Sequence, residues 1–140
     1  MISYFDSSSI VKWFFDEPGA ALARSEKDSA TIAFTSIISL PEVMSAFSRA
    51  FREDRCTPSD LEQIRGEFLR VWPNFQKVKI NESLVYHSGQ LVFIHNLCGF
   101  DSVHLASALV VKNNCQDETF FSCFDHRLNR AAHLEGLTTH

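Results

Sequence analysis

The chain of 140 residues is 45% hydrophobic and 21% charged, which is the composition of one globular domain over residues 1–140 and excludes a disordered chain. Its formal net charge of −4 argues against binding of nucleic acid through bulk positive charge, although a local basic strip stays open. No segment has the length of a membrane span, and Asp6 interrupts the apolar start before a signal peptide could form, so we expect a cytoplasmic protein that binds no membrane.

Apolar runs and turn signals predict strands and helices in alternation along the chain. In chain order these are a strand over 2–5, helices over 8–15 and 20–27, a strand over 31–34, a long helix from 39, a helix over 57–72, a strand over 75–80, a helix over 81–95 closed by Gly99, an apolar helix from 101, a strand over 119–124 and a helix over 126–134. Ser39 and Glu42 have the spacing of a capping box. The alternation predicts a three-layer α/β/α fold with a mainly parallel sheet.

Four acidic residues stand at or just inside a predicted helix start, namely Asp6, Glu42, Asp101 and Asp125. Taken alone, each is explained most simply as a helix cap, because acids satisfy the free N–H groups there. Asp6 and Asp125, however, each directly follow an apolar strand, so a parallel sheet places both at its carboxyl edge. Asp101 begins a helix that is apolar nearly all round, and its carboxylate should therefore point into the centre of the domain.

Four carboxylates gathered at one place would repel one another unless a cation lay among them. Their sequence neighbours, such as Ser7 and Ser102, carry no positive charge, and the four cysteines lack the spacing of a zinc site. We therefore expect a divalent metal, and an oxygen-only ligand set favours Mg²⁺ or Mn²⁺. A metal held in this way activates water for the hydrolysis of phosphodiester bonds.

Four motifs follow one another in order: Tyr4-Phe5-Asp6-Ser7-Ser8, Leu40-Pro41-Glu42-Val43, the run from Phe100 to Ala108, and Phe124-Asp125-His126-Arg127-Leu128. In these motifs, over nearly its whole length, the chain resembles the PIN-domain ribonucleases, most closely the VapC toxins of bacterial toxin–antitoxin pairs. The resemblance implies an RNA-cleaving enzyme that leaves 5′-phosphate and 3′-hydroxyl ends, a homodimer, and a VapB-like antitoxin that wraps and inhibits it. It also implies that the acidic metal site consists of Asp6, Glu42, Asp101 and Asp125.

Other side chains are candidates for supporting roles. Ser8 either supports the site, by holding a metal-bound water or orienting Asp6, or caps the following helix, and the sequence leaves both readings open. His104, one helical turn after Asp101, is expected to be a hydrogen-bonded core histidine rather than a zinc ligand. The cationic candidates for phosphate contacts are Lys12, Arg49, Arg52 and Arg55. The three arginines are explained equally well as the solvated face of a surface helix.

The chain departs from the family pattern at three places. Cys98 stands where a basic residue is common, Cys123 stands where a Ser or Thr is common, and the closing strand is short or missing before His140. Two other functions fit the sequence less well. A phosphatase of the haloacid-dehalogenase type needs a second Asp two positions after Asp6, where Ser8 stands. A catalytically silent PIN-fold module that binds RNA or protein would gain stability by neutralising its acids, and the chain retains all four.

Overall fold

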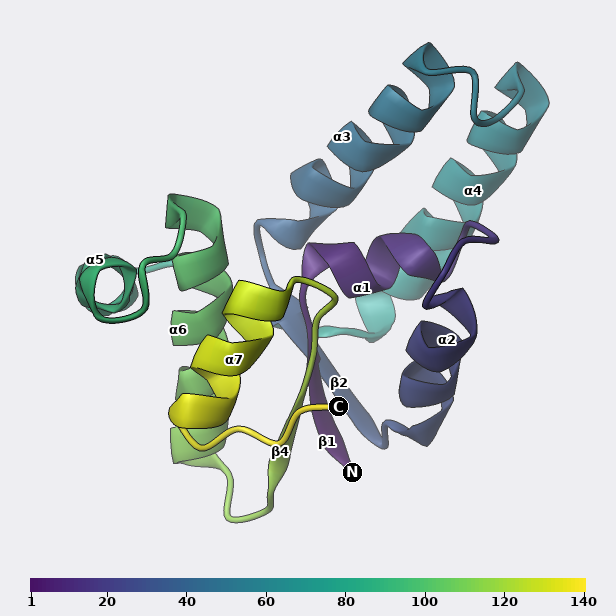
Figure 1. Ribbon diagram of the computed structural model, residues 1–140. Helices are drawn as coiled ribbons and strands as arrows, with labels where there is room; N and C mark the ends of the chain where they lie inside the picture. Colours follow the sequence, from purple (N-terminus) through teal and green to yellow (C-terminus); the bar gives the residue numbers. More distant parts are fainter.

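The computed structural model describes all residues from 1 to 140 and contains a four-stranded sheet with helices on both faces (Figure 1). In chain order the elements are β1 (Ile2–Phe5), α1 (Ser7–Lys12), α2 (Ala20–Ser29), β2 (Ile32–Ser36), α3 (Ser39–Arg52), α4 (Pro58–Val71), the 3-10 helix η1 (Trp72–Asn74), β3 (Gln76–Val78), α5 (Glu82–His95), α6 (Gly99–Asn114), β4 (Thr119–Ser122) and α7 (His126–Leu134). The strand order is β3-β2-β1-β4, and every neighbouring pair is parallel. The predicted three-layer fold is therefore confirmed.

Strand β1 lies inside the sheet, between β2 and β4. Ile2 is in register with Ile32 of β2, and Phe5 with Ser122 of β4. Because the strands are parallel, the helices that follow β1, β2 and β4, which are α1, α3 and α7, all begin at the carboxyl edge of the sheet. The chain continues to β2 on one side of β1 and returns to β4 on the other, and open α/β folds bind ligands at such a switch point.

Two hydrophobic cores lie on opposite faces of the sheet, because successive side chains of a strand point to opposite faces. Tyr4 belongs to the first core, which α5, α6 and α7 cover, and its ring stacks on Phe121 with the centroids 5.6 Å apart. Phe5 belongs to the second core, which is rich in aromatic rings such as Phe47 and Phe68 from the α3–α4 hairpin. Figure 1 shows the two groups of helices on either side of the sheet. The end of β1 is therefore held from both sides.

Helix α6 is buried along much of its length, as its apolar sequence predicts. Its buried side chains are Ser102, His104, Leu105, Ala106, Ser107, Ala108, Leu109 and Val111. The helix begins at Gly99, two residues earlier than predicted, so Asp101 lies inside its first turn. This depth brings the first turns of α6 next to the carboxyl edge of β1.

Helix α1 ends at Lys12, and the prediction reached three residues too far. The N–H groups of Trp13 and Phe14 bond the carbonyls of Ile10 and Val11, three residues back, and this tighter winding ends the α-helix. The aromatic rings after this point pack into the second core instead of lying along a helix face. Strand β2 is two residues longer than predicted at its end, whereas β3 and β4 stop two residues earlier.

Two further helix ends are set by residues in the left-handed conformation. Helix α3 ends before Asp54, which turns the chain at a φ of 57°, so Arg55 lies outside the helix and pairs with Glu53. Helix α5 ends at His95 as predicted, but its C-cap is Asn96, whose φ is 53°, and Gly99 begins α6 instead of closing α5. Asn and Asp tolerate this left-handed conformation better than other residues with side chains, and they supply both stops.

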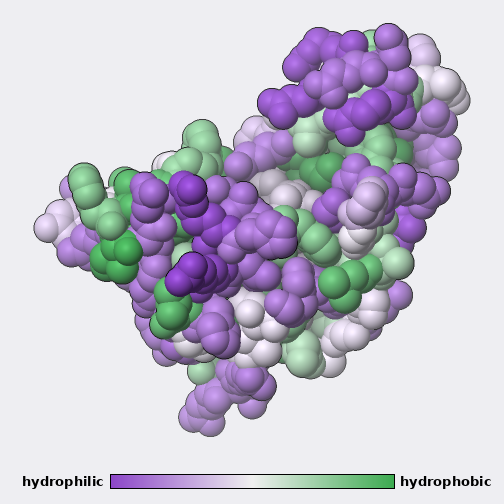
Figure 2. Space-filling view, in the orientation of Figure 1, coloured by the Kyte–Doolittle hydropathy of each residue, from purple (hydrophilic) through white to green (hydrophobic).

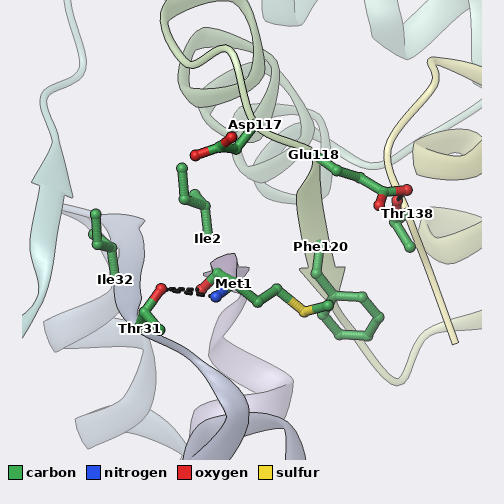
Figure 3. A pocket seen from close by; sticks show the side chains of 8 residues that line it. All are labelled: Met1, Ile2, Thr31, Ile32, Asp117, Glu118, Phe120 and Thr138. Atoms are coloured by element: carbon green, nitrogen blue, oxygen red, sulfur yellow. Dashed lines mark hydrogen bonds between the residues drawn. The ribbon is translucent and has the colours of Figure 1, made fainter.

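The segment after α7 returns along β4. Thr138 forms a single parallel bridge with Phe120, so the closing strand is short, as expected. At this amino-terminal edge of the sheet a hollow of about 300 Å³ lies among Met1, Ile2, Thr31, Ile32, Asp117, Glu118, Phe120 and Thr138 (Figure 3). It is on the opposite edge from the predicted acidic site. No single helix of the chain is long and apolar enough to cross a membrane.

Candidate active site

All four predicted acids lie at helix N-termini at the carboxyl edge of the sheet. Asp6 is the N-cap residue of α1 and Asp125 that of α7, and each accepts a hydrogen bond from a backbone N–H of the first turn. Glu42 lies in the first turn of α3, and Asp101 in the first turn of α6. Figure 1 shows these helix starts at the same end of the sheet. Asp6 and Asp125 therefore cap their helices and also lie at the carboxyl edge of the sheet.

Asp6 is the most buried of the four carboxylates, with 4% of its surface exposed. Its Oδ1 accepts from the Ser8 hydroxyl at 2.7 Å and from the Ser9 N–H at 3.0 Å. Burial raises the pKa of Asp6 above its ordinary value, although His104 and these hydrogen bonds oppose the rise. The Ser8 hydroxyl also accepts from the Phe124 N–H at 3.3 Å. Ser8 therefore orients Asp6 and ties it to the end of β4, and it is not the cap of α1.

Glu42 does not form the predicted capping box with Ser39. The N-cap residue of α3 is Ile38, and the Ser39 hydroxyl instead bonds the Thr35 hydroxyl at 2.7 Å. Because Glu42 does not cap the helix, its Oε1 is available to accept hydrogen bonds from the Ser7 hydroxyl and from His104 Nε2, the latter at 2.6 Å. Partial burial raises the pKa of Glu42, but the contacts with His104 and Ser7 outweigh it, and the net pKa of Glu42 is lowered.

His104 links the first core to Glu42. Its Nδ1 bonds the hydroxyl of Tyr4 at 2.8 Å, and its Nε2 carries the proton that the Glu42 carboxylate accepts. Burial raises the pKa of Tyr4 well above its ordinary value, so its hydroxyl keeps its proton. The prediction of a buried, hydrogen-bonded histidine is confirmed, with 2% of the residue exposed. The link to Glu42 was missed, because no sequence spacing connects residues in α3, α6 and β1.

Of the two remaining acids, Asp125 is exposed and Asp101 is partly buried, and each lies near a cysteine. Cys98 donates to Asp101 Oδ2 at 3.0 Å, and this bond, with the charge of Asp125 adding to it, raises the pKa of the Cys98 thiol. Burial raises the pKa of Cys123, and the charges of Asp6 and Asp125 raise it further. Each cysteine thus lies close to two of the acids, at the positions where the sequence departs from the family pattern.

A hollow of about 500 Å³ opens at this edge, lined by Ser7, Ser8, Val11, Lys12, Glu17, Glu42, Ala46, Phe124 and Asp125. None of the four acids forms an ion pair with Lys or Arg. Carboxylate oxygens without a fixed counter-charge are a donor set that suits a hard divalent cation. No group of three or more His, Cys, Asp or Glu side chains, however, has the spacing to hold a metal ion. The metal site therefore stays a prediction.

Of the cationic candidates, the structure brings only Lys12 to this hollow. Its Nζ donates to the Pro18 carbonyl at 2.8 Å and pairs with Glu17 at 3.1 Å. Arg49 and Arg52 are exposed near the far end of α3, about 10 and 15 Å along the helix from Glu42. The arginines of α3 are thus away from the acids, as a solvated helix face would be.

The sequence signature of the PIN domain matches residues 3–134. This match covers nearly the whole chain, and the chain therefore belongs to the PIN-domain family. Within it, the chain is 34% identical over 133 residues to ribonuclease VapC45 of Mycobacterium tuberculosis strain CDC 1551 and to ribonuclease VapC49 of strain H37Rv. These matches cover 95% of this chain and 90% of each relative.

Solved structures show the same fold. FitAcB from Neisseria gonorrhoeae superposes with a TM-score of 0.73 at 13% identity, over 99% of this chain and 96% of that chain. The Sarcin-Ricin loop cleaving toxin VapC20 of Mycobacterium tuberculosis superposes with a TM-score of 0.69 at 15% identity, over 97% of this chain and 96% of that one. A toxin–antitoxin complex from Klebsiella pneumoniae superposes with a TM-score of 0.58 at 18% identity, over 84% of this chain and 83% of that chain. At these identities the likeness concerns the fold alone.

Proposed function

We propose that this protein is a metal-dependent endoribonuclease, the toxin of a toxin–antitoxin pair, which hydrolyses phosphodiester bonds of RNA. The observation that carries the proposal is the acidic edge, where four carboxylates lie at helix N-termini and none is paired with Lys or Arg. The relationship to the VapC ribonucleases supports the choice of RNA as substrate.

The four carboxylates would hold Mg²⁺ or Mn²⁺, with Asp6 and Asp101 as ligands and Glu42 and Asp125 binding directly or through water. When bound, the cation lowers the pKa of a water ligand and offsets the charge that develops on the phosphate. The groups of the chain prepare the site for this chemistry. Ser8 orients Asp6, and the lowered pKa of Glu42 keeps it ionised.

The geometry at Glu42 also indicates how it acts. Its Oε1 is occupied by Ser7 and His104, whereas its Oε2 accepts no hydrogen bond from the protein. Because Glu42 lines the hollow, this free oxygen can accept a hydrogen bond from the attacking water. Lys12, on the same hollow, can contact the phosphate. By family resemblance the products carry 5′-phosphate and 3′-hydroxyl ends.

Cleavage of a structured RNA by the purified protein tests this function. We expect cleavage with Mg²⁺ or Mn²⁺, none in EDTA, and a loss on the order of 100-fold or more in Asp101→Asn, as removal of one electrostatic group of an active site commonly produces. The matched control is Asp117→Asn, because Asp117 is an exposed acid at the opposite edge of the sheet. Undiminished cleavage in EDTA or by Asp101→Asn would refute the proposal, and RNA binding without cleavage would favour a silent module.

Two partners belong to the proposal. A VapB-like antitoxin is expected to bind and inhibit the toxin in the cytoplasm. A homodimer is the second, and the exposed face of α5 offers a surface for it, because Tyr86 and Phe93 are 74% and 92% exposed on one side of that helix. Figure 2 shows hydrophobic side chains gathered over α5.

Phe93→Glu tests the dimer, because a charge in an apolar interface is costly to bury. We expect sedimentation to give a dimer for the wild type and a monomer for Phe93→Glu. Leu22→Glu, on the exposed side of α2, is the control and should leave the dimer intact. A wild type that sediments as a monomer at all concentrations would contradict this assignment.

A further inference from the structure

A second hollow, of about 350 Å³, lies beside the acidic edge between the end of α5 and the exposed side of α7. It is lined by Ile94, His95, Asn96, Arg127, Arg130, Ala131 and Leu134. No acidic side chain is among the lining residues, although the whole chain carries a net charge of −4. Figure 2 shows a strongly hydrophilic patch over α7 next to the hydrophobic side chains of α5. We call this hollow the α5–α7 groove.

The positive charge of the α5–α7 groove is largely free. Arg127 donates from Nη1 to the Asn96 carbonyl at 3.2 Å, which fixes its guanidinium but involves no counter-charge. Arg130 forms no ion pair. Asp125 caps the same helix but forms no ion pair with either arginine, and Glu135 is already engaged with His95 Nε2 at 2.6 Å. Two guanidinium groups thus face solvent in a concave site without carboxylate partners.

The α5–α7 groove lies along the helix that begins at the candidate active site. Asp125 caps α7, and Arg127 and Arg130 follow it by two and five residues, which is about 3 and 8 Å along the helix. The two arginines are three residues apart and therefore share one face of α7. Ile94 and Leu134, 65% and 66% exposed, add apolar surface at the same place. These groups are thus within reach of an anionic strand that extends from the acidic edge along α7.

We propose that the α5–α7 groove binds the backbone of the RNA strand next to the cleavage site, with Arg127 and Arg130 contacting its phosphates. The proposal rests on the RNA substrate of the proposed function. A guanidinium presents a planar fork of donors that matches a phosphate, and exposed apolar side chains beside it can receive a ribose or a base. The free charge and the nearness to Asp125 along α7 favour an RNA strand over an acidic protein segment.

The test uses the double variant Arg127→Gln/Arg130→Gln. Both residues are exposed, so the fold should be retained, which a thermal midpoint close to that of the wild type verifies. In the Asp101→Asn background, filter binding of labelled ribosomal RNA should weaken about 10-fold or more, and the slope of log affinity against log salt should become shallower by about 1.4 if both phosphate contacts are lost. In the active protein we expect KM for RNA to rise by a similar factor, with kcat nearly unchanged.

The matched control is Arg65→Gln/Arg70→Gln, which removes the same charge from the exposed side of α4 and should leave RNA binding within about two-fold of the wild type. A groove variant that binds and cleaves RNA like the wild type would overturn the inference and leave the proposed function standing. Loss of binding to an antitoxin, with RNA binding intact, would also overturn it. RNA binding that depends on the groove in a protein that never cleaves RNA would support the inference and refute the nuclease.

Discussion

Asp6→Asn protein is expected to lose RNA cleavage, on the order of 100-fold or more, and yet to unfold at a higher temperature than the wild type in EDTA. The reason is that burial raises the pKa of Asp6, so the folded protein holds the proton more tightly than the unfolded chain does. The contribution of Asp6 to stability is therefore present in full at acid pH. This contribution falls as the pH rises from the ordinary pKa of an aspartate to the raised pKa of Asp6 in the folded protein. At neutral pH the ionised Asp6 therefore destabilises the fold.

An asparagine at this position removes the charge and keeps the cap, because its carbonyl can still accept from the Ser8 hydroxyl and the Ser9 N–H. Differential scanning calorimetry from pH 4 to pH 8 measures the effect, and each kcal/mol moves the midpoint by about 4 °C in a domain of this size. Mg²⁺ should raise the midpoint of the wild type and leave Asp6→Asn unchanged. The control Asp16→Asn alters an exposed carboxylate and should change neither stability nor cleavage. A midpoint of Asp6→Asn well below that of the wild type in EDTA would contradict this account.

Phe47→Ala is expected to lower the free energy of unfolding by about 3–5 kcal/mol, a large part of the 5–15 kcal/mol typical of a single domain. Phe47 is fully buried in the second core, with its ring in edge-to-face contact with Phe14 at 5.4 Å and Phe68 at 6.0 Å. Truncation leaves a cavity among α1, α3 and α4, which hold one side of the acidic edge. Urea unfolding measures the change as a lower midpoint at an unchanged slope.

The control for this change is Phe51→Ala, four residues along the same helix, where 39% of the residue is exposed. It should cost less than half as much, because part of the ring is already in water. An effect of Phe47→Ala no larger than that of Phe51→Ala would show that the second core does not pack as the structure describes.

The fold was predictable because its local signals agree with one another. The apolar strand at Ile2–Phe5 forms as predicted, and the helices predicted over 57–72 and 81–95 form with Thr57 and Asn81 as their N-caps. The end of α1 was predicted wrongly because it depends on tertiary contacts, since the aromatic residues that follow it pack into the second core.

The candidate site was predictable in its residue types but not in its contacts. The position of an acid after a strand or at a helix start placed Asp6, Asp101 and Asp125 at one edge of the sheet. For Glu42 the same reasoning fails. Its spacing from Ser39 predicts a capping box, but in the structure neither residue caps α3. The hydrogen bonds that join Tyr4, His104 and Glu42 connect three elements, and they form only because α6 packs against the sheet.

The α5–α7 groove could not be predicted for a similar reason. Arg127 and Arg130 are ordinary residues of an exposed helix face in the sequence, where charged side chains are common. Their unpaired state matters only because the end of α5 forms the other wall of the hollow. The overall charge of the chain, which argued against a broad basic surface, is compatible with one local basic site.

The central claim is that Asp6, Glu42, Asp101 and Asp125 together bind one hard divalent cation, or two, at the carboxyl edge of the sheet. The most direct measurement is a crystal structure of the protein grown with Mn²⁺, with the anomalous signal of manganese recorded. The account predicts an anomalous peak within about 2.5 Å of carboxylate oxygens of Asp6 and Asp101, with the other two acids bound directly or through water. The absence of a peak at this edge in crystals saturated with Mn²⁺, or a peak held only by other residues, would contradict it.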